Sequence, residues 1–205
     1  MSDEQQSESA RFMLEEYRNI AATHDKLRDH TAQLFNFFLI MTAVPFTIAG
    51  IALKDVGFDL FHAPPSLHLL VLLLGAVDFF MAMAIVDARL GQYRYARTVN
   101  LIRAYFADMD KDIMPYLYMP TTPMTPSFDK LGYVGSQANI VAAVGALYAG
   151  YGMLWVFEQK THLSFDTSGI LAIAVAIIYV VAYILYRARR ALAMERECKS
   201  IRPVH

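Results

Sequence analysis

Four long blocks of apolar residues, separated by polar segments, dominate the pattern of the chain. A helix that rises about 1.5 Å per residue needs about 20 apolar residues to cross the ~30 Å hydrocarbon core of a bilayer. Each block is close to that length, and the first carries no charge. The blocks cover residues 34–53, 67–86, 137–157 and 169–186. The pattern predicts an all-α, polytopic membrane protein with four transmembrane helices.

The cationic residues indicate how these helices are oriented. Of the 18 Lys and Arg, only Lys54 and Lys160 lie in the two short connections that follow the first and third blocks. Because Lys and Arg are retained on the cytoplasmic side of a membrane, we expect both termini and the middle connection to be cytoplasmic. The short outer connections, which lack glycosylation sequons, favour a bacterial inner membrane. The predicted cytoplasmic parts are an amphipathic helix at 1–33, a helical extension at 87–110, a Pro-rich loop at 111–136 and a basic tail at 187–205.

Composition agrees with a chain whose main partner is the lipid bilayer. The sequence is 56% hydrophobic and 18% charged, with a mean hydropathy of +0.33, which departs from soluble averages. A net charge of −1 gives no electrostatic footprint for nucleic acid. The one cysteine, Cys198, permits no internal disulfide and no cysteine-based metal cluster.

Two apolar seams run along the predicted cytoplasmic helices. The first alternates steps of four and three, the spacing of one helix face, and continues into the first block, which predicts one rod that bends, if anywhere, at Pro45. The second begins in the second block and extends below it. The seam positions are Met13, Tyr17, Ile20, His24 and Leu27 in the first, and Tyr95, Val99, Ile102 and Phe106 in the second.

These seams leave two arrangements open. They bury each other within one subunit, or one of them pairs with its copy in a homo-oligomer. His24 is the polar residue on its seam; such a residue sets register in paired helices, and a histidine titrates near neutral pH. The Pro-rich loop, whose proline density excludes regular helix, either caps the spans or docks a cytoplasmic protein partner.

Asp78 is the candidate functional residue inside the membrane. It lies about 16 Å along the second span, close to the midplane, where a charge is costly and faces protein or water. Its potential partners are the hydroxyls and amides of the spans: Thr42, Thr47, Asn139, Tyr148, Tyr151, Tyr179 and Tyr183. Asp78 either joins helices through hydrogen bonds in its neutral form, or lines a polar path that exchanges protons or attracts cations.

Small residues and tyrosines mark the faces of the last two spans that meet protein. In the third span they are four residues apart and form a ridge that lets another helix approach closely; in the fourth span tyrosines share one face and need hydrogen-bond partners. The ridge consists of Ala138, Ala142, Ala146 and Gly150, and the tyrosines are Tyr179, Tyr183 and Tyr186.

Motifs for catalysis or cofactor binding are not apparent. The sequence contains no Gly-rich phosphate loop, no nucleophile elbow and no helical His-x-x-x-His zinc signature. The segment from His24 to His30 has four potential metal ligands, but on a helix they spread around most of the circumference, so we expect local ion pairs there. The expectation is a protein without enzymatic activity, metal or cofactor.

The order of these parts resembles that of the SLATT-type membrane proteins. The resemblance rests on an amphipathic helix rich in Glu and Arg, from Glu15-Glu16-Tyr17-Arg18 to Asp29, which enters a first span, and on a second span that continues as a long cytoplasmic helix. It covers about the first 110 residues, and the second pair of spans departs from it. It implies a pore-forming or membrane-disrupting effector of bacterial conflict systems, with a nucleotide-sensing partner protein. No functional residue is carried over.

Three functions follow as hypotheses. The first is a non-enzymatic, homo-oligomeric regulated pore or membrane effector, with the cytoplasmic helices as the place where a signal acts. The second is a scaffold or accessory subunit that recruits a larger complex. The third is a proton-coupled transporter. This hypothesis is weaker, because the sequence lacks the repeated pair of broken helices that is typical of such transporters.

Overall fold

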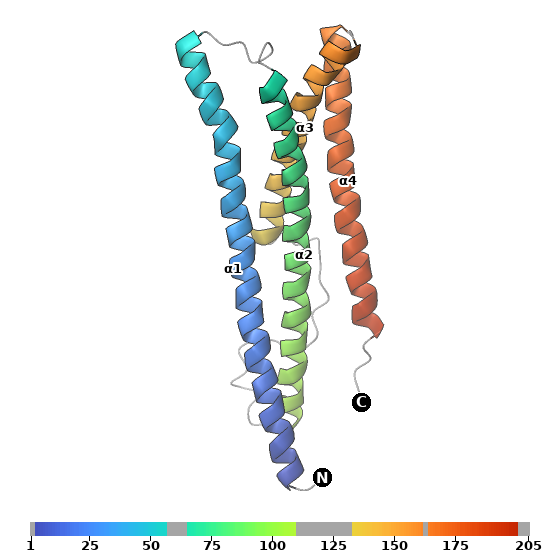
Figure 1. Cartoon of the computed structure of the whole chain (residues 1–205). Coiled ribbons are helices and arrows are strands. Elements are labelled where there is room, and N and C mark those ends of the chain that lie inside the picture. Colours follow the sequence, from blue (N-terminus) through green and yellow to red (C-terminus); the bar gives the residue numbers. More distant parts are fainter. Residues whose placement is uncertain (1–2, 57–64, 110–132, 162–163, 201–205) are drawn as a thin grey trace.

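The chain folds into four long helices that alternate in direction (Figure 1). This computed structural model describes residues 3–56, 65–109, 133–161 and 164–200. The helices are α1 (Asp3–Val56), α2 (Pro65–Met109), α3 (Tyr133–Thr161) and α4 (Phe165–Ser200). Most of the predicted Pro-rich loop and the end of the predicted tail lie outside the described residues. The prediction of an all-α chain is confirmed.

Three of the helices are long and apolar enough to cross a membrane. They are α2, residues Gly135–Glu158 of α3 and residues Asp166–Glu197 of α4. α2 begins at Pro65, a residue suited to the start of a helix because Pro has no N–H to leave unpaired. Ser164 precedes α4, where its carbonyl accepts the Ser168 N–H at 3.0 Å and its hydroxyl contacts Thr167.

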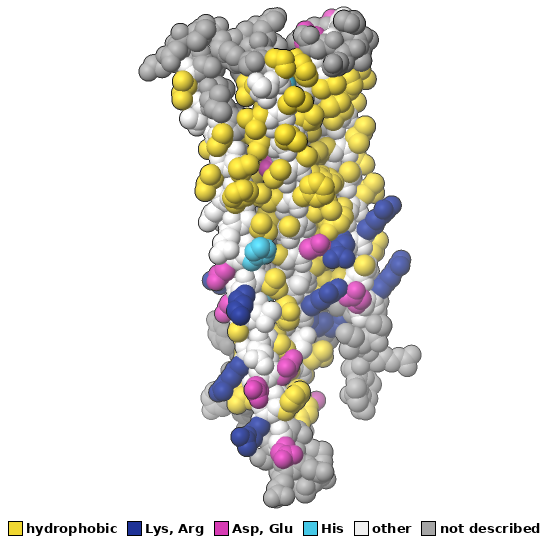
Figure 2. Space-filling view, viewed as in Figure 1, with side chains coloured by type: hydrophobic (Ala, Val, Ile, Leu, Met, Phe, Trp, Pro, Cys, Tyr) yellow, Lys and Arg dark blue, Asp and Glu magenta, His cyan; other side chains and the backbone are white. Residues whose placement is uncertain are grey.

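α1 and α2 are much longer than a membrane crossing requires. α1 has 54 residues and continues through Pro45 without a break, and α2 has 45. Their parts near the N-terminus, residues 3–33 of α1 and 91–109 of α2, form a two-helix extension that we call the stalk (Figure 1). We call the remaining part, in which all four helices pack, the bundle. Charged side chains gather on the stalk end and apolar ones on the bundle (Figure 2).

α1 and α2 contact each other within one chain. Every seam position is buried or half-buried, whereas the charged positions beside them are mostly exposed. Arg103 of α2 donates a hydrogen bond to the Tyr17 hydroxyl at 3.3 Å and lies over its ring at 5.9 Å. His24 is half-exposed and contacts Asp25 at 3.8 Å. Thr31 of α1 is buried, and its hydroxyl donates to the Leu27 carbonyl of the same helix.

α4 extends further than expected. The sequence places a basic tail after residue 186, yet the helix runs to Ser200. The reason is local, since the segment is rich in Ala, Arg and Glu, which are strong helix formers. α4 packs mainly on α3, and its outward face in the bundle is apolar and exposed. That face consists of Ile170, Ile173, Ile177, Val181 and Ile184.

Candidate functional site

Asp78 lies in the interior of the bundle. Its side chain is 1% exposed, and it points from α2 toward α3 and α4. Its Oδ2 atom is fully buried and has no hydrogen-bond partner in the part of the chain that the structure describes. A buried, unpaired carboxylate oxygen is costly, so this position is the strongest candidate for a functional group.

Gly145 creates the space next to Asp78. A Cβ atom placed on Gly145 would lie 2.0 Å from the Tyr179 hydroxyl and 2.8 Å from the Asp78 Cβ. Both groups therefore converge on one point of α3, from α4 and α2 respectively. Only glycine fits there, because real Cβ contacts are longer than 3.0 Å.

Two tyrosine hydroxyls surround the carboxylate without donating to it. Tyr179 donates to the backbone carbonyl of Gly75 at 3.0 Å, and Tyr148 of α3 donates to the carbonyl of Thr42 at 3.2 Å. Both phenols interact electrostatically with Asp78. The Thr42 hydroxyl is itself buried without a hydrogen-bond partner among the described residues. Asp78, Tyr148, Tyr179, Gly145 and Thr42 form what we call the Asp78 cluster, which draws on all four helices.

The other polar residues considered as partners of Asp78 lie elsewhere. Tyr183 donates to Asn139 at 2.9 Å, and Arg187 donates to the same amide oxygen at 3.1 Å, nearer the stalk. Thr47 donates to its own helix at the Ala43 carbonyl. These contacts satisfy Asn139 and Tyr183 apart from the Asp78 cluster.

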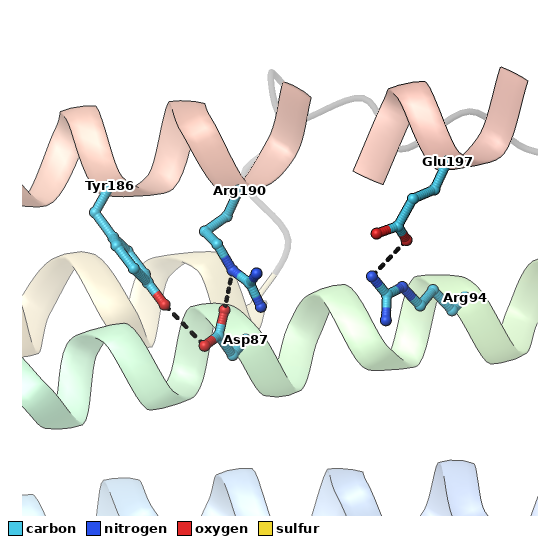
Figure 3. Close-up of polar contacts among 5 residues, drawn as sticks. All are labelled: Asp87, Arg94, Tyr186, Arg190 and Glu197. Carbon is cyan, nitrogen blue, oxygen red and sulfur yellow. Dashed lines mark hydrogen bonds and ion pairs between the residues drawn. The ribbon is translucent and has the colours of Figure 1, made fainter. Parts of the chain in front are cut away.

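A group of ion pairs joins α2 to α4 where the bundle meets the stalk (Figure 3). Asp87 accepts hydrogen bonds from the Tyr186 hydroxyl and from Arg190, both at 2.8 Å, and Arg94 pairs with Glu197 two turns further along each helix. These pairs are partly exposed, so each contributes little stability; they fix the position of α4.

His68 is a buried residue that the sequence analysis did not select. It is 2% exposed and stacks on Tyr151 at 5.0 Å and on Trp155 at 5.8 Å between ring centroids. These contacts tie the far end of α2 to α3. The sequence did contain a signal: a single histidine stands at the start of the second apolar block, and the third block contains two aromatic residues, Tyr151 and Trp155, that can stack on it.

The small-residue ridge of α3 proves to have two sides. The predicted side is buried, and at Gly150 it faces α4, where an added Cβ would lie 3.2 Å from the Ala172 carbonyl. The other side was not predicted and faces α2. Gly145 and Gly152 belong to it, and a Cβ on Gly152 would lie 2.7 Å from the Leu72 Cβ. Close approach of α2 and α3 thus depends on glycine beside Asp78, at Gly145, and again about two turns further along α3, at Gly152.

The described residues contain no group of three or more His, Cys, Asp or Glu side chains placed to hold a metal ion.

Comparison of the chain with protein-family models, with curated proteins and with solved structures gives no match. The function is therefore argued from the geometry.

Proposed function

We propose that the chain is a non-enzymatic integral membrane protein that acts as a homo-oligomeric regulated pore or membrane effector. One observation carries the proposal. α1 and α2 each run without a break from the charged stalk into the apolar bundle, and they pack on each other along the way. A change of packing in the stalk is therefore transmitted to the bundle around Asp78.

The proposed topology has four spans, with residues 34–53 of α1 as the first. Support comes from the apolar side chains that α1 exposes in this segment, which include Phe37, Ile40, Val44 and Ile51; such a surface is stable in lipid. The first residues of α1 and the last residues of α2 and α4 lie toward the same end of the molecule (Figure 1). The distribution of Lys and Arg supports a cytoplasmic position for that end, in a bacterial inner membrane.

In this conformation the proposed pore is closed. Asp78 is buried within one chain, and Tyr179 and Gly145 fill the space beside it. Access to Asp78 requires that α4 separates from α2. Its contact with α2 is limited and includes the exposed ion pairs at Asp87 and Arg94. The proposal agrees with what the resemblance to SLATT-type proteins implies.

Two measurements test the proposal. Native mass spectrometry of the nanodisc-purified protein should give an oligomer of defined number, and proteoliposomes should conduct ions when the stalk is perturbed. The perturbation is Tyr17→Ala, which removes the contact with Arg103. Arg11→Gln, at an exposed position of the same helix, is the control. A protein that is strictly monomeric, and that conducts no ions in either variant, would contradict the proposal.

A second candidate is a scaffold or accessory subunit that recruits a cytoplasmic protein. The observation that favours it is the exposure of Phe12, at 66%, and Leu14, at 48%, on the stalk, where water rather than lipid surrounds the helix in the proposed topology. A stoichiometric partner that is captured by the full chain, and lost on Phe12→Ser or on deletion of residues 114–126, would favour this function. Retention of the same partner by both variants would count against it.

A further inference from the structure

The carboxylate of Asp78 has no positive charge to balance it. The titratable groups that face it are Tyr148 from α3 and Tyr179 from α4. From α1, the Thr42 carbonyl accepts the hydrogen bond of the Tyr148 hydroxyl. No Lys, Arg or His forms an ion pair with Asp78 within the described ranges. Since an unpaired charge in an apolar interior is far more costly than a neutral carboxyl group, the packed bundle favours the neutral acid.

The hydrogen bond of Tyr179 is the one expected beside a neutral acid. An ionised carboxylate is the stronger acceptor, and it would attract the nearby Tyr179 hydroxyl. Instead this hydroxyl donates to the Gly75 carbonyl at 3.0 Å. Its oxygen is then free to accept a hydrogen bond from the protonated Asp78, which would complete a hydrogen-bonded chain from Asp78 through Tyr179 to Gly75.

The space around the carboxylate suits a proton rather than a metal ion. A methyl group on Gly145 would already overlap the Tyr179 hydroxyl, at 2.0 Å, and crowd Asp78, at 2.8 Å. An ion with a shell of oxygen ligands needs more room than that, whereas a proton needs none. The Gly75 and Thr42 carbonyls are also occupied by the tyrosine hydroxyls.

We propose that Asp78 is a proton-binding site inside the bundle, and that its protonation determines the hydrogen-bond partner of Tyr179. With the proton bound, Tyr179 joins α4 to the α2 backbone at Gly75, as observed. When the proton leaves to water, Tyr179 turns to the Asp78 carboxylate and releases Gly75, and water must reach the charge. Proton binding thus holds α4 against α2 and α3. The inference does not depend on the proposed pore.

Infrared spectroscopy of the full chain in micelles of an alkyl maltoside, a detergent without a carbonyl group of its own, tests the site directly. At about pH 6, carboxyl groups with an ordinary pKa near 4 are ionised, so a carboxylic-acid C=O band reports only a protonated, shielded group. The band is expected in wild type, should disappear as the pH rises, and should be absent in Asp78→Asn. Asp87→Asn, which changes a partly exposed carboxylate in the same helix, should keep the band.

Tyr179→Phe supplies the second variant. It removes the hydroxyl that accepts from Asp78 but leaves the acid, so the band should persist at a shifted frequency. If Asp78→Asn does not fold, labelling the aspartates of wild type with ¹³C at the carboxyl carbon should shift the band without any substitution. Absence of an aspartic-acid band in wild type at about pH 6, or its persistence in Asp78→Asn, would overturn the proposal.

The pH dependence of stability supplies an independent measurement. A group that binds its proton more tightly in the folded state stabilises the fold at low pH, and this contribution is lost as the pH rises. The unfolding temperature of wild type should therefore fall relative to that of Asp78→Asn as the pH increases. Parallel pH profiles for the two proteins would also contradict the site.

Discussion

Gly145 offers the sharpest test of how the bundle is packed. Gly145→Ala places a methyl group 2.0 Å from the Tyr179 hydroxyl and 2.8 Å from the Asp78 Cβ, between three helices that hold these groups. Overpacking of a core costs about 1–3 kcal/mol, and displacement of the hydrogen bond from Tyr179 to Gly75 costs about 1 kcal/mol more. The expected loss in the free energy of unfolding is therefore about 2–4 kcal/mol.

The protein contains a control position for this substitution, Gly135, and a fluorescent probe of unfolding, Trp155. Nothing lies within 4 Å of a Cβ on Gly135, in the same helix, so Gly135→Ala should be neutral or stabilise the protein by up to about 1 kcal/mol. Trp155 is the one tryptophan of the sequence and stacks on His68 of α2. Its fluorescence during denaturant unfolding in detergent micelles therefore reports the contact between α2 and α3.

A double-mutant cycle separates the proposed clash from a general loss of stability. Tyr179→Phe removes the atom nearest to the added methyl group, so it should recover part of the loss in the Gly145→Ala background, with a coupling energy of at least about 1 kcal/mol. Part of the loss should remain, because the Asp78 Cβ and the Tyr179 Cζ still lie within 3 Å of the methyl position. A stable Gly145→Ala protein, or strictly additive effects, would refute the reasoning.

Three further substitutions test other contacts. Gly152→Ala would bring a methyl group within 3.0 Å of the Leu72 backbone, so it should lower the free energy of unfolding by about 1–3 kcal/mol, as measured by Trp155 fluorescence. Asp87→Asn removes a partly exposed ion pair and should cost less than about 1 kcal/mol while increasing proteolysis of the α4 terminus. Tyr17→Phe removes one hydroxyl from the stalk and should cost about 1 kcal/mol with little change in hydrogen exchange of the bundle; a larger change there would contradict a local effect.

The sequence predicts the helices well because their signals are periodic. The run at 34–53 and the seam of α1 share one helical phase, so a single rod follows from spacing alone, and α1 is indeed continuous. The helical tail after residue 186 was not predicted, because its arginines led the sequence analysis to treat the segment only as a basic tail. Ala and Glu between them continue the helix instead.

The site is predicted less completely, because it depends on contacts between helices. Asp78 was identified from its charge in an apolar block, and Tyr148 and Tyr179 were two of seven candidate partners. Spacing alone cannot select them, since the choice depends on which face of α3 meets α2. Gly145 was missed because the ridge of alanines on α3 suggested a different contact face, and the role of glycine there appears only when the positions of Tyr179 and Asp78 are known.

The unbroken α2 also sets the scale of movement that the stalk can impose. About 45 Å of helix separates Asp78 from Met109 at ~1.5 Å per residue, so a tilt of one degree about Asp78 displaces the tip by roughly 0.8 Å. A displacement of 4 Å at the tip, about the size of a side chain, corresponds to a tilt of roughly five degrees. Within the bundle that tilt moves residues one turn from Asp78 by only about half an ångström. Since the contact at Gly145 has no spare room, a displacement of several ångströms imposed on the tip of the stalk would reach the bundle as a movement about eight times smaller and correspondingly larger in force.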